Sequence, residues 1–251
     1  MFLPPLIAIV VGITLILQAL PASSAGENVS AQVASENSAG SKTRFQYAIL
    51  ESSLVNSEWV VVNKHRPLPR DFETPELVAI RQSTSLENPR KLTMRPTAAA
   101  ALEEMARDMA RLGAGTLFIN SAYRSYDYQA ELFKSKVKQY GMTLALLKSA
   151  KAGYSEHQTG LAVDVSVPAQ GCAILECFGE TKAGKWIADF SWRYGYIVRY
   201  KKDTTDITGY AYEPWHLRYI GKELAREYHE GGFRTLEDFW GMPSAPDYPT
   251  N

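Results

Sequence analysis

Apolar residues recur along the chain with two different periods, and these periods predict both helices and strands. Across residues 96–112 the apolar positions lie four and three residues apart in turn, so they share one face of a helix that Gly113 ends. Across residues 160–167 apolar and polar side chains alternate instead, which is typical of a strand with one buried face. The chain is therefore expected to combine helices with short strands.

The same patterns predict the remaining elements of the domain. Helices are expected over residues 126–140, 144–152, 186–194 and 222–230. Strands are expected over residues 116–121, 196–200 and 215–220. Helices and short strands alternate at irregular intervals, which favours an α+β fold with an antiparallel or mixed sheet over a doubly wound fold.

The first 25 residues have the pattern of a targeting segment. Residues 6–17 are almost all apolar, and small residues follow up to Ala25, as in a signal peptide with its cleavage site. The segment has no basic residue at its start and is nearly long enough to span a bilayer, so a retained membrane anchor is the alternative. Either form predicts export, to the periplasm or cell envelope or out of the cell. Residues 26–44 are expected to form a flexible spacer, and residues 45–251 the folded domain.

The charges of the chain balance, because 27 Lys and Arg residues face 27 Asp and Glu residues among 251 residues. Without a basic excess the usual electrostatic case for nucleic-acid binding is missing, so we expect no nucleic-acid partner. Hydrophobic residues make up 45% and charged residues 22%, which is typical of a soluble globular domain and excludes a disordered or collagen-like chain for most of the length. We expect a single domain and a monomer.

One carboxylate interrupts the predicted strand at residues 160–167. Asp164 lies in the middle of this apolar segment, and a buried carboxylate is costly unless it is paired, hydrogen-bonded or bound to a metal. His157 precedes it by seven residues, and Gly160 between them permits a tight turn, so the two side chains could converge. The alternative is an exposed strand face with Asp164 in water.

A second histidine and a second carboxylate follow in the predicted strand near residue 215. Glu213 and His216 lie three residues apart, and in an ideal strand such residues point to opposite faces. They can share a site only if Pro214 bends the backbone; otherwise this is an edge strand with an exposed Glu and His.

Two imidazoles and one carboxylate with a fourth position open describe a catalytic zinc site, here His157, Asp164 and His216. The same set of ligands can also hold iron. Glu213 would then be a non-ligating general base.

The spacing SxHxxGxAxD at residues 155–164, followed by ExxH at residues 213–216, resembles the zinc D-Ala-D-Ala carboxypeptidases of the VanY type. The blocks at residues 62–69, 121–129 and 208–210 resemble that family as well, so the likeness runs from about residue 60 to residue 221. It implies a small α+β zinc-peptidase domain with a mostly antiparallel sheet flanked by helices. It also implies one Zn²⁺ per chain and a peptidoglycan stem peptide ending in D-alanine as substrate.

The resemblance assigns a role to each matching residue. It makes His157, Asp164 and His216 the zinc ligands and Glu213 the general base. Arg124 matches the active-site arginine, whose guanidinium can polarise the scissile carbonyl; a surface salt bridge is the alternative. Gln129 and Ser155 match positions that line the substrate groove. Their alternatives are an exposed helix residue and a turn residue.

One segment departs from the family pattern. Cys172 and Cys177 enclose four residues in an insertion-like loop, and in an exported protein we expect them to form a disulfide. A second metal site is the alternative, but it lacks other ligands nearby. This loop leaves the substrate preference open.

The sequence therefore predicts an exported zinc metallocarboxypeptidase that removes the terminal D-Ala from stem peptides. An L,D-carboxypeptidase or a cell-wall endopeptidase would share the same zinc site. A non-catalytic peptidoglycan-binding module is the alternative of another class, and a zinc-free structural domain is a third. Glu213 argues against the binding module, because such a module needs no base beside a complete set of ligands.

Overall fold

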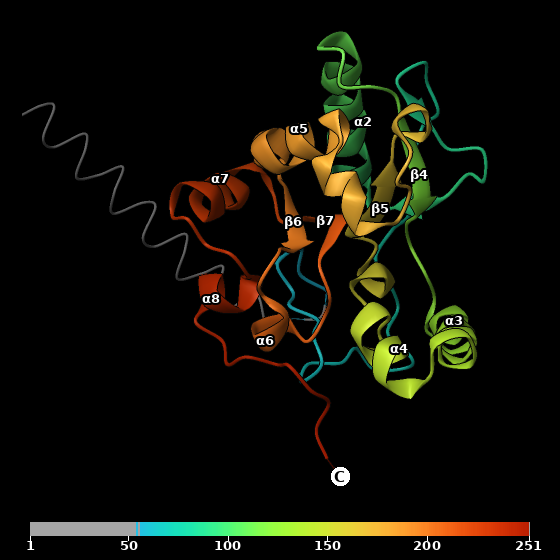
Figure 1. The fold of residues 1–251 in the computed structure, drawn as a ribbon, viewed down its shortest axis with the longest axis vertical. Coiled ribbons are helices and arrows are strands. Elements are labelled where there is room, and N and C mark those ends of the chain that lie inside the picture. The colour runs from blue at the N-terminus through green and yellow to red at the C-terminus, as the bar shows by residue number, and fades with distance from the viewer. Residues whose placement is uncertain (1–53, 55, 251) are drawn as a thin grey trace, which may run out of the picture. The chain divides into compact units, whose positions relative to one another are not determined.

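A five-stranded mixed sheet with the strand order β2-β4-β5-β7-β6 forms the centre of the computed structural model, which describes residues 54 and 56–250 (Figure 1). The strands are β2 (Leu86–Glu87), β4 (Leu117–Ser121), β5 (Ala162–Ser166), β6 (Tyr196–Tyr200) and β7 (Glu213–Tyr219). Only the pair β2–β4 is parallel; β4–β5, β5–β7 and β6–β7 are antiparallel. A second sheet pairs β1 (Val78–Ala79) with β3 (Thr93–Met94). The expected α+β class with a mostly antiparallel sheet is confirmed.

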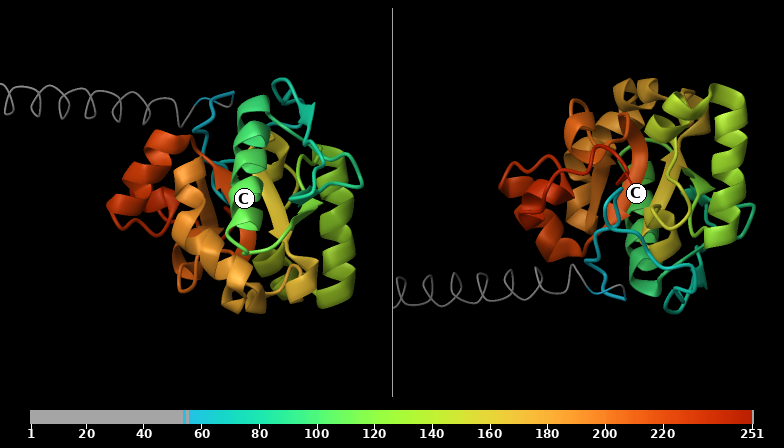
Figure 2. Two further views of the ribbon diagram at one scale, coloured as in Figure 1. Left: turned by 90° about the horizontal axis from the view of Figure 1, so that it is seen from above. Right: turned by 90° about the horizontal axis from the view of Figure 1, so that it is seen from below.

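Helices pack against both faces of this sheet. They are α2 (Pro96–Arg111), α3 (Tyr126–Tyr140), α4 (Met142–Lys148), α5 (Lys182–Phe190), α6 (Thr205–Thr208), α7 (Lys222–Glu230) and α8 (Leu236–Trp240). The short 3₁₀ helices are η1 (Glu156–Thr159), η2 (Pro168–Gln170), η3 (Glu176–Glu180) and η4 (Ser191–Tyr194). Figures 1 and 2 show α2 and α5 next to one another and α3 and α4 grouped apart from them.

The apolar face of the sheet packs against α2 and α5. Val163 and Val165 of β5 share one buried cluster with Leu102 and Met105 of α2 and with Ile187 of α5. Burying such side chains removes apolar surface from water and contributes about 1.5–3 kcal/mol for each of them. Because side chains alternate along β5, the residues between these valines point to the opposite face, where the polar cluster lies.

Most predicted elements form where the periodicity places them. The helices over residues 126–140 and 222–230 and the strand over residues 196–200 match α3, α7 and β6. The helix predicted over residues 144–152 forms as α4, but it begins and ends earlier: it ends at Lys148, and Ser149 is already extended, with φ −158°. The helix predicted over residues 186–194 begins earlier, where Thr181 caps α5 by accepting a hydrogen bond from the Gly184 N–H, and its end is the 3₁₀ turn η4.

The predicted targeting segment (residues 1–25) and the predicted spacer (residues 26–44) lie outside the described residues. The described part of the chain begins at residue 54, so the predicted start of the domain at residue 45 lies outside it as well. These predictions therefore stay predictions. Within the described part of the chain, no helix is both long enough and apolar enough to cross a membrane.

Candidate metal centre

Asp164 and His216 are direct partners in the antiparallel pair β5–β7, so their side chains lie side by side on the polar face of the sheet. Both are buried. His157 reaches the same point from η1, which ends at Gly160 in the left-handed conformation, with φ 73° and ψ 12°. This glycine turns the chain from η1 towards β5, as the sequence suggested.

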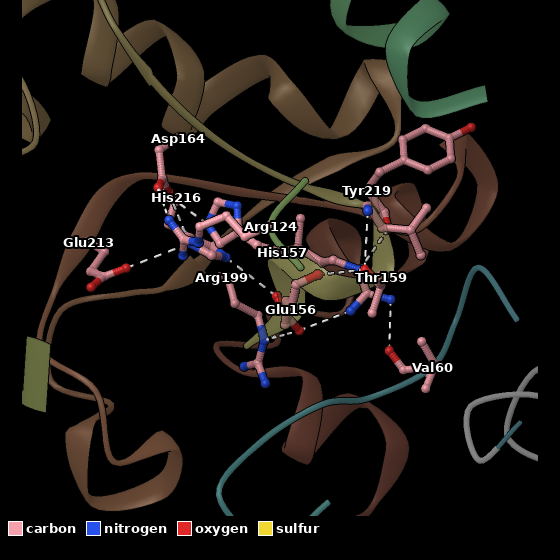
Figure 3. Close-up of polar contacts among 12 residues, drawn as sticks. Val60, Arg124, Glu156, His157, Thr159, Asp164, Arg199, Glu213, His216 and Tyr219 are labelled. Carbon is pink, nitrogen blue, oxygen red and sulfur yellow. Dashed lines mark hydrogen bonds and ion pairs between the residues drawn. The ribbon is translucent and has the colours of Figure 1, made fainter. Parts of the chain in front are cut away.

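The three side chains converge closely (Figure 3). Nε2 of His157 lies 3.2 Å from Oδ2 of Asp164, and Nδ1 of His216 lies 3.1 Å from Oδ1. One nitrogen or oxygen of each residue lies within 4.8 Å of those of the others. Nδ1 of His157 is 2.6 Å from the Ala122 carbonyl, which can only accept, so this nitrogen carries the proton and Nε2 keeps its lone pair for a metal.

Glu213 reaches the cluster through a bulge in β7. Val198 pairs with Leu217 and Tyr200 pairs with Glu213, so a step of two residues along β6 matches a step of four along β7. The additional residues include Pro214, and they supply the bend that the spacing required. As a result, Oε2 of Glu213 lies 3.6 Å from Nδ1 of His216, on the same side of the sheet.

Arg124 lies between β4 and α3, three residues after the end of β4, and its backbone N–H donates to the His157 carbonyl over 3.2 Å. Its Nη1 donates to Oγ of Ser121 at 2.9 Å and lies 3.5 Å from Oδ2 of Asp164. The guanidinium therefore faces the cluster and does not form a surface salt bridge.

Burial and neighbouring charges shift the ionisation of the cluster in the metal-free protein. Burial raises the pKa of Glu213 to about 7 in spite of the nearby His216. Burial and the Arg124 charge lower the pKa of His157 to about 4. For His216, burial acts downwards but the neighbouring carboxylates of Asp164 and Glu156 outweigh it and raise the pKa to about 9. Asp164 stays ionised, because the two histidines hold its pKa well below its usual value against burial.

The donor set fits a divalent metal. Nε2 of His157 and Oδ1 of Asp164 are buried and have no hydrogen-bond partner among the described residues. Buried polar atoms without a partner destabilise the protein unless a ligand binds them. Two imidazoles and one carboxylate form a ligand set that zinc accepts. The described residues contain this single group of three or more potential ligands.

Glu156 connects the cluster to a buried charge network that the sequence analysis missed. Its Oε2 lies 3.5 Å from Nε2 of His216, whereas its Oε1 accepts hydrogen bonds from Arg199 and Arg218, each at 2.9 Å. Arg199 also forms two bonds, of 2.8 and 3.0 Å, to the carboxylate of Glu237 in α8. Ionised partners on all sides hold the pKa of Glu156 far below its usual value against burial. In the sequence, the only indication of this network is that charged residues lie inside apolar segments.

A cleft of about 260 Å³ opens beside the cluster. Ser155, which was expected in the substrate groove, is one of the residues that line this cleft, and so are Tyr200 and Tyr210, which the sequence analysis did not single out. Gln129 does not line this cleft; it is buried and its Nε2 donates to the Ala150 carbonyl at 2.7 Å. Gln129 therefore supports the loop after α4, which forms part of the wall.

The expected disulfide is present, between Cys172 and Cys177. Ile174, at the centre of this loop, lies at the edge of the cleft.

The fold and site define a mixed α/β domain with a buried two-histidine, one-carboxylate cluster, and the comparisons with known proteins agree. Residues 91–222 match the family VanY, D-alanyl-D-alanine carboxypeptidase. This is more than half of the chain, which therefore belongs to the VanY family.

Three similar proteins support this assignment. YodJ of Bacillus subtilis (strain 168) is 42% identical over 72% of this chain; the chain spans 66% of YodJ, just under two thirds. The solved LD-carboxypeptidase LdcB is 39% identical with a TM-score of 0.68, covering 76% of this chain and 88% of that one. The D,D-pentapeptidase VanY from a VanB-type resistance cassette, solved as a variant in complex with Zn(II), is 31% identical with a TM-score of 0.58, covering 72% and 97%.

Proposed function

We propose that the protein is an exported zinc carboxypeptidase that removes the terminal D-alanine from peptidoglycan stem peptides. The observation that carries this proposal is Glu213, a partly buried carboxylate 3.6 Å from His216 and outside the three-residue group that can hold a metal. A protein that only binds its ligand needs no such base. The names of the relatives, a D,D-pentapeptidase and an LD-carboxypeptidase, supply the substrate class.

His157, Asp164 and His216 would hold the zinc ion, which supplies a Lewis acid and lowers the pKa of water in its open position. The structure of the VanY relative with Zn(II) favours this metal over iron. The hydrogen bond from His157 to Ala122 and the Glu156 carboxylate beside His216 fix the two rings for this task.

Glu213 would accept a proton from the attacking water and pass it to the leaving amino group. A general base works best with a pKa near the working pH, and burial brings the pKa of this carboxyl to about 7 before metal binds. Arg124 would stabilise the negative charge that develops on the carbonyl oxygen, because its guanidinium is held beside Asp164 and faces the cleft.

An L,D-carboxypeptidase is the second candidate, because LdcB is the more similar of the two solved relatives described above. The two activities share the zinc chemistry and differ in the residue before the cleaved bond. Export to the cell envelope is supported by the apolar run near the N-terminus, which would act either as a signal peptide or as an anchor.

The test is mass spectrometry of stem peptides incubated with the zinc-loaded chain. A pentapeptide ending in D-Ala-D-Ala reports the D,D activity, and a tetrapeptide ending in a single D-Ala reports the L,D activity. We expect loss of one alanine from one of them, abolished by a chelator. The Glu213→Gln variant should keep about one zinc and lose activity by about 10²–10⁴-fold.

Glu180→Gln is the matched control, because Glu180 is an exposed carboxylate that pairs only with surface lysines. It should act like the parent chain. A zinc-loaded chain that cleaves neither peptide would reject the proposed function, and a folded chain that binds no metal would reject the site.

A further inference from the structure

We propose that Tyr248, near the C-terminus, is a positioning residue that holds one wall of the cleft in the shape that receives the peptide. This inference rests on the proposed function and deepens it, because it names a residue outside the metal centre that sets substrate affinity. The segment that carries Tyr248 follows α8 and lies beyond residue 222, where the match to the VanY family ends (Figure 1). The family assignment therefore gives this segment no role.

This wall of the cleft is built from two segments that are far apart in the sequence. Ser149 and Ala150, after α4, and Tyr210, between α6 and β7, all line the cleft, and we call these three residues the Tyr210 wall. A backbone hydrogen bond of 3.0 Å, from the Ala211 N–H to the Leu147 carbonyl, joins the two segments. None of the three residues belongs to the potential metal ligands. The wall can therefore shape the cleft without taking part in the reaction.

The hydroxyl of Tyr248 contacts both of these segments. It accepts a hydrogen bond of 2.9 Å from the backbone N–H of Lys151, the residue directly after Ala150. It also lies 3.3 Å from the hydroxyl of Tyr210, and either of these two oxygens can donate to the other. One oxygen atom of the C-terminal segment thus connects the chain after α4 to Tyr210. Removing this atom takes a hydrogen-bond partner from both segments at once.

The ring of Tyr248 is held by three other side chains. It meets the Tyr154 ring edge to face, with the two centres 4.8 Å apart. The Nζ atoms of Lys151 and Lys64 lie 4.3 and 5.2 Å from the centre of the Tyr248 ring. A lysine ammonium within about 6 Å of an aromatic ring attracts it. Packing therefore determines where the hydroxyl lies.

Lys64 also connects the backbone of the C-terminal segment to the loop that carries Tyr210. Its side chain is buried, and Nζ donates to the Gly209 carbonyl at 2.7 Å and to the Pro246 carbonyl at 2.9 Å. The Ala245 N–H donates to the Ile207 carbonyl at 2.7 Å. Gly209, with φ 75°, has no room for a side chain, because a Cβ there would collide with the Pro246 oxygen. The loop and the C-terminal segment are therefore in direct backbone contact.

The contacts that place the metal centre are different ones. The pairing of β5 with β7 sets Asp164 beside His216, and His157 is bound to the Ala122 carbonyl. Loosening the Tyr210 wall should therefore weaken peptide binding and leave the chemical step at saturating substrate nearly unchanged. A residue that only stabilised the fold would not raise KM while kcat stays the same.

The test is Tyr248→Phe in the zinc-loaded full chain, which removes the hydroxyl and keeps the ring. We expect the KM for the stem peptide that is cleaved to rise by about three- to tenfold, the size of a neutral hydrogen bond, and kcat to change by less than about twofold. Hydrogen exchange followed by mass spectrometry should become faster over residues 149–154, because the Lys151 N–H loses its acceptor.

Tyr194→Phe is the matched control, because it removes a tyrosine hydroxyl that donates to Asp108 at 2.6 Å, and neither residue lines the cleft. It should change neither KM nor the exchange over residues 149–154. Tyr210→Phe removes the other hydroxyl of the pair with Tyr248. Combining it with Tyr248→Phe should therefore raise KM by no more than about twofold beyond the larger single effect.

An unchanged KM in an active Tyr248→Phe chain would overturn the proposal. A lower kcat with an unchanged KM, or a similar rise in KM for Tyr194→Phe, would overturn it as well. If the parent chain cleaves no stem peptide, the proposed function fails and hydrogen exchange decides about the wall. Faster exchange over residues 149–154 in Tyr248→Phe then supports the positioning role, and unchanged exchange rejects it.

Discussion

Oε2 of Glu156 lies 3.5 Å from Nε2 of His216, while the other nitrogen of the same ring faces Asp164 at 3.1 Å. Glu156 is thus the outer partner of a potential metal ligand. Carboxylates in this position orient the imidazole and raise its basicity, and their loss commonly lowers metal affinity by about 10–100-fold.

Glu156→Gln should therefore lower zinc affinity by about 10–100-fold, measured by competition with a chelator of known affinity. The side chain keeps its size but loses the charge that faces His216 and the two arginines. Near-ultraviolet circular dichroism would show whether the variant keeps its packing. Glu180→Gln serves as the exposed control. Unchanged zinc affinity in a folded Glu156→Gln protein would contradict the orienting role.

Zinc binding should release about 1.5 protons at pH 7. In the metal-free protein His216, with a pKa of about 9, is protonated, and Glu213, with a pKa of about 7, is half protonated. A bound cation expels the full proton from His216 and about half a proton from Glu213, whereas His157, with a pKa of about 4, is already neutral. Zinc affinity should consequently rise with pH up to about 9.

Calorimetry in buffers with different ionisation enthalpies gives this proton count directly. Glu213→Gln should reduce it to about one. A proton count of about one half or less for the parent chain at pH 7 would mean that His216 is neutral before the metal arrives.

Glu237→Gln should destabilise the domain by about 3–5 kcal/mol in urea unfolding, because it leaves Arg199 without one partner in the interior. Both side chains of this pair are completely buried. Glu131→Gln removes the same charge from the exposed Lys134 pair, whose side chains are 71% and 73% accessible, and should cost less than about 1 kcal/mol. Similar losses for the two variants would show that the buried network is not specially stabilising.

Gly160→Ala should cost more stability than Gly241→Ala, although both glycines are left-handed. Each change carries a backbone penalty of about 1–2 kcal/mol. At Gly160 the new Cβ would also lie 2.8 Å from Leu77, whereas nothing lies within 4 Å at Gly241. Only Gly160→Ala should also weaken zinc binding, since its turn sets His157 against Asp164. Equal effects in thermal unfolding and zinc titration would refute this.

The potential metal ligands could be located from the sequence because their signals are local. Asp164 interrupts an alternating strand, and Gly160 marks the turn that brings His157 back. Glu213 can reach the site only if the backbone bends at Pro214. The sequence indicated that this bend was needed, but only the structure shows that it forms.

The supporting residues could not be predicted, because their partners lie far away along the chain. Arg199 and Arg218 occupy strand positions that a period of two assigns to a polar face, where water is the default partner. Their actual partner, Glu156, lies 43 and 62 residues earlier. Gln129 was misplaced for a related reason: its hydrogen bond goes to Ala150, in a segment that was predicted to be helical.

The buried network also implies an order of folding and metal binding while the chain is being synthesised. The three potential metal ligands are all present once residue 216 has been synthesised, but Arg199 is fully paired only after Glu237 in α8 has docked. Asn63, near the start of the described chain, then donates to that same glutamate at 3.0 Å. A high-affinity metal centre should consequently be the last feature of the nascent domain to mature, and metal uptake would report that the two ends of the domain have come together.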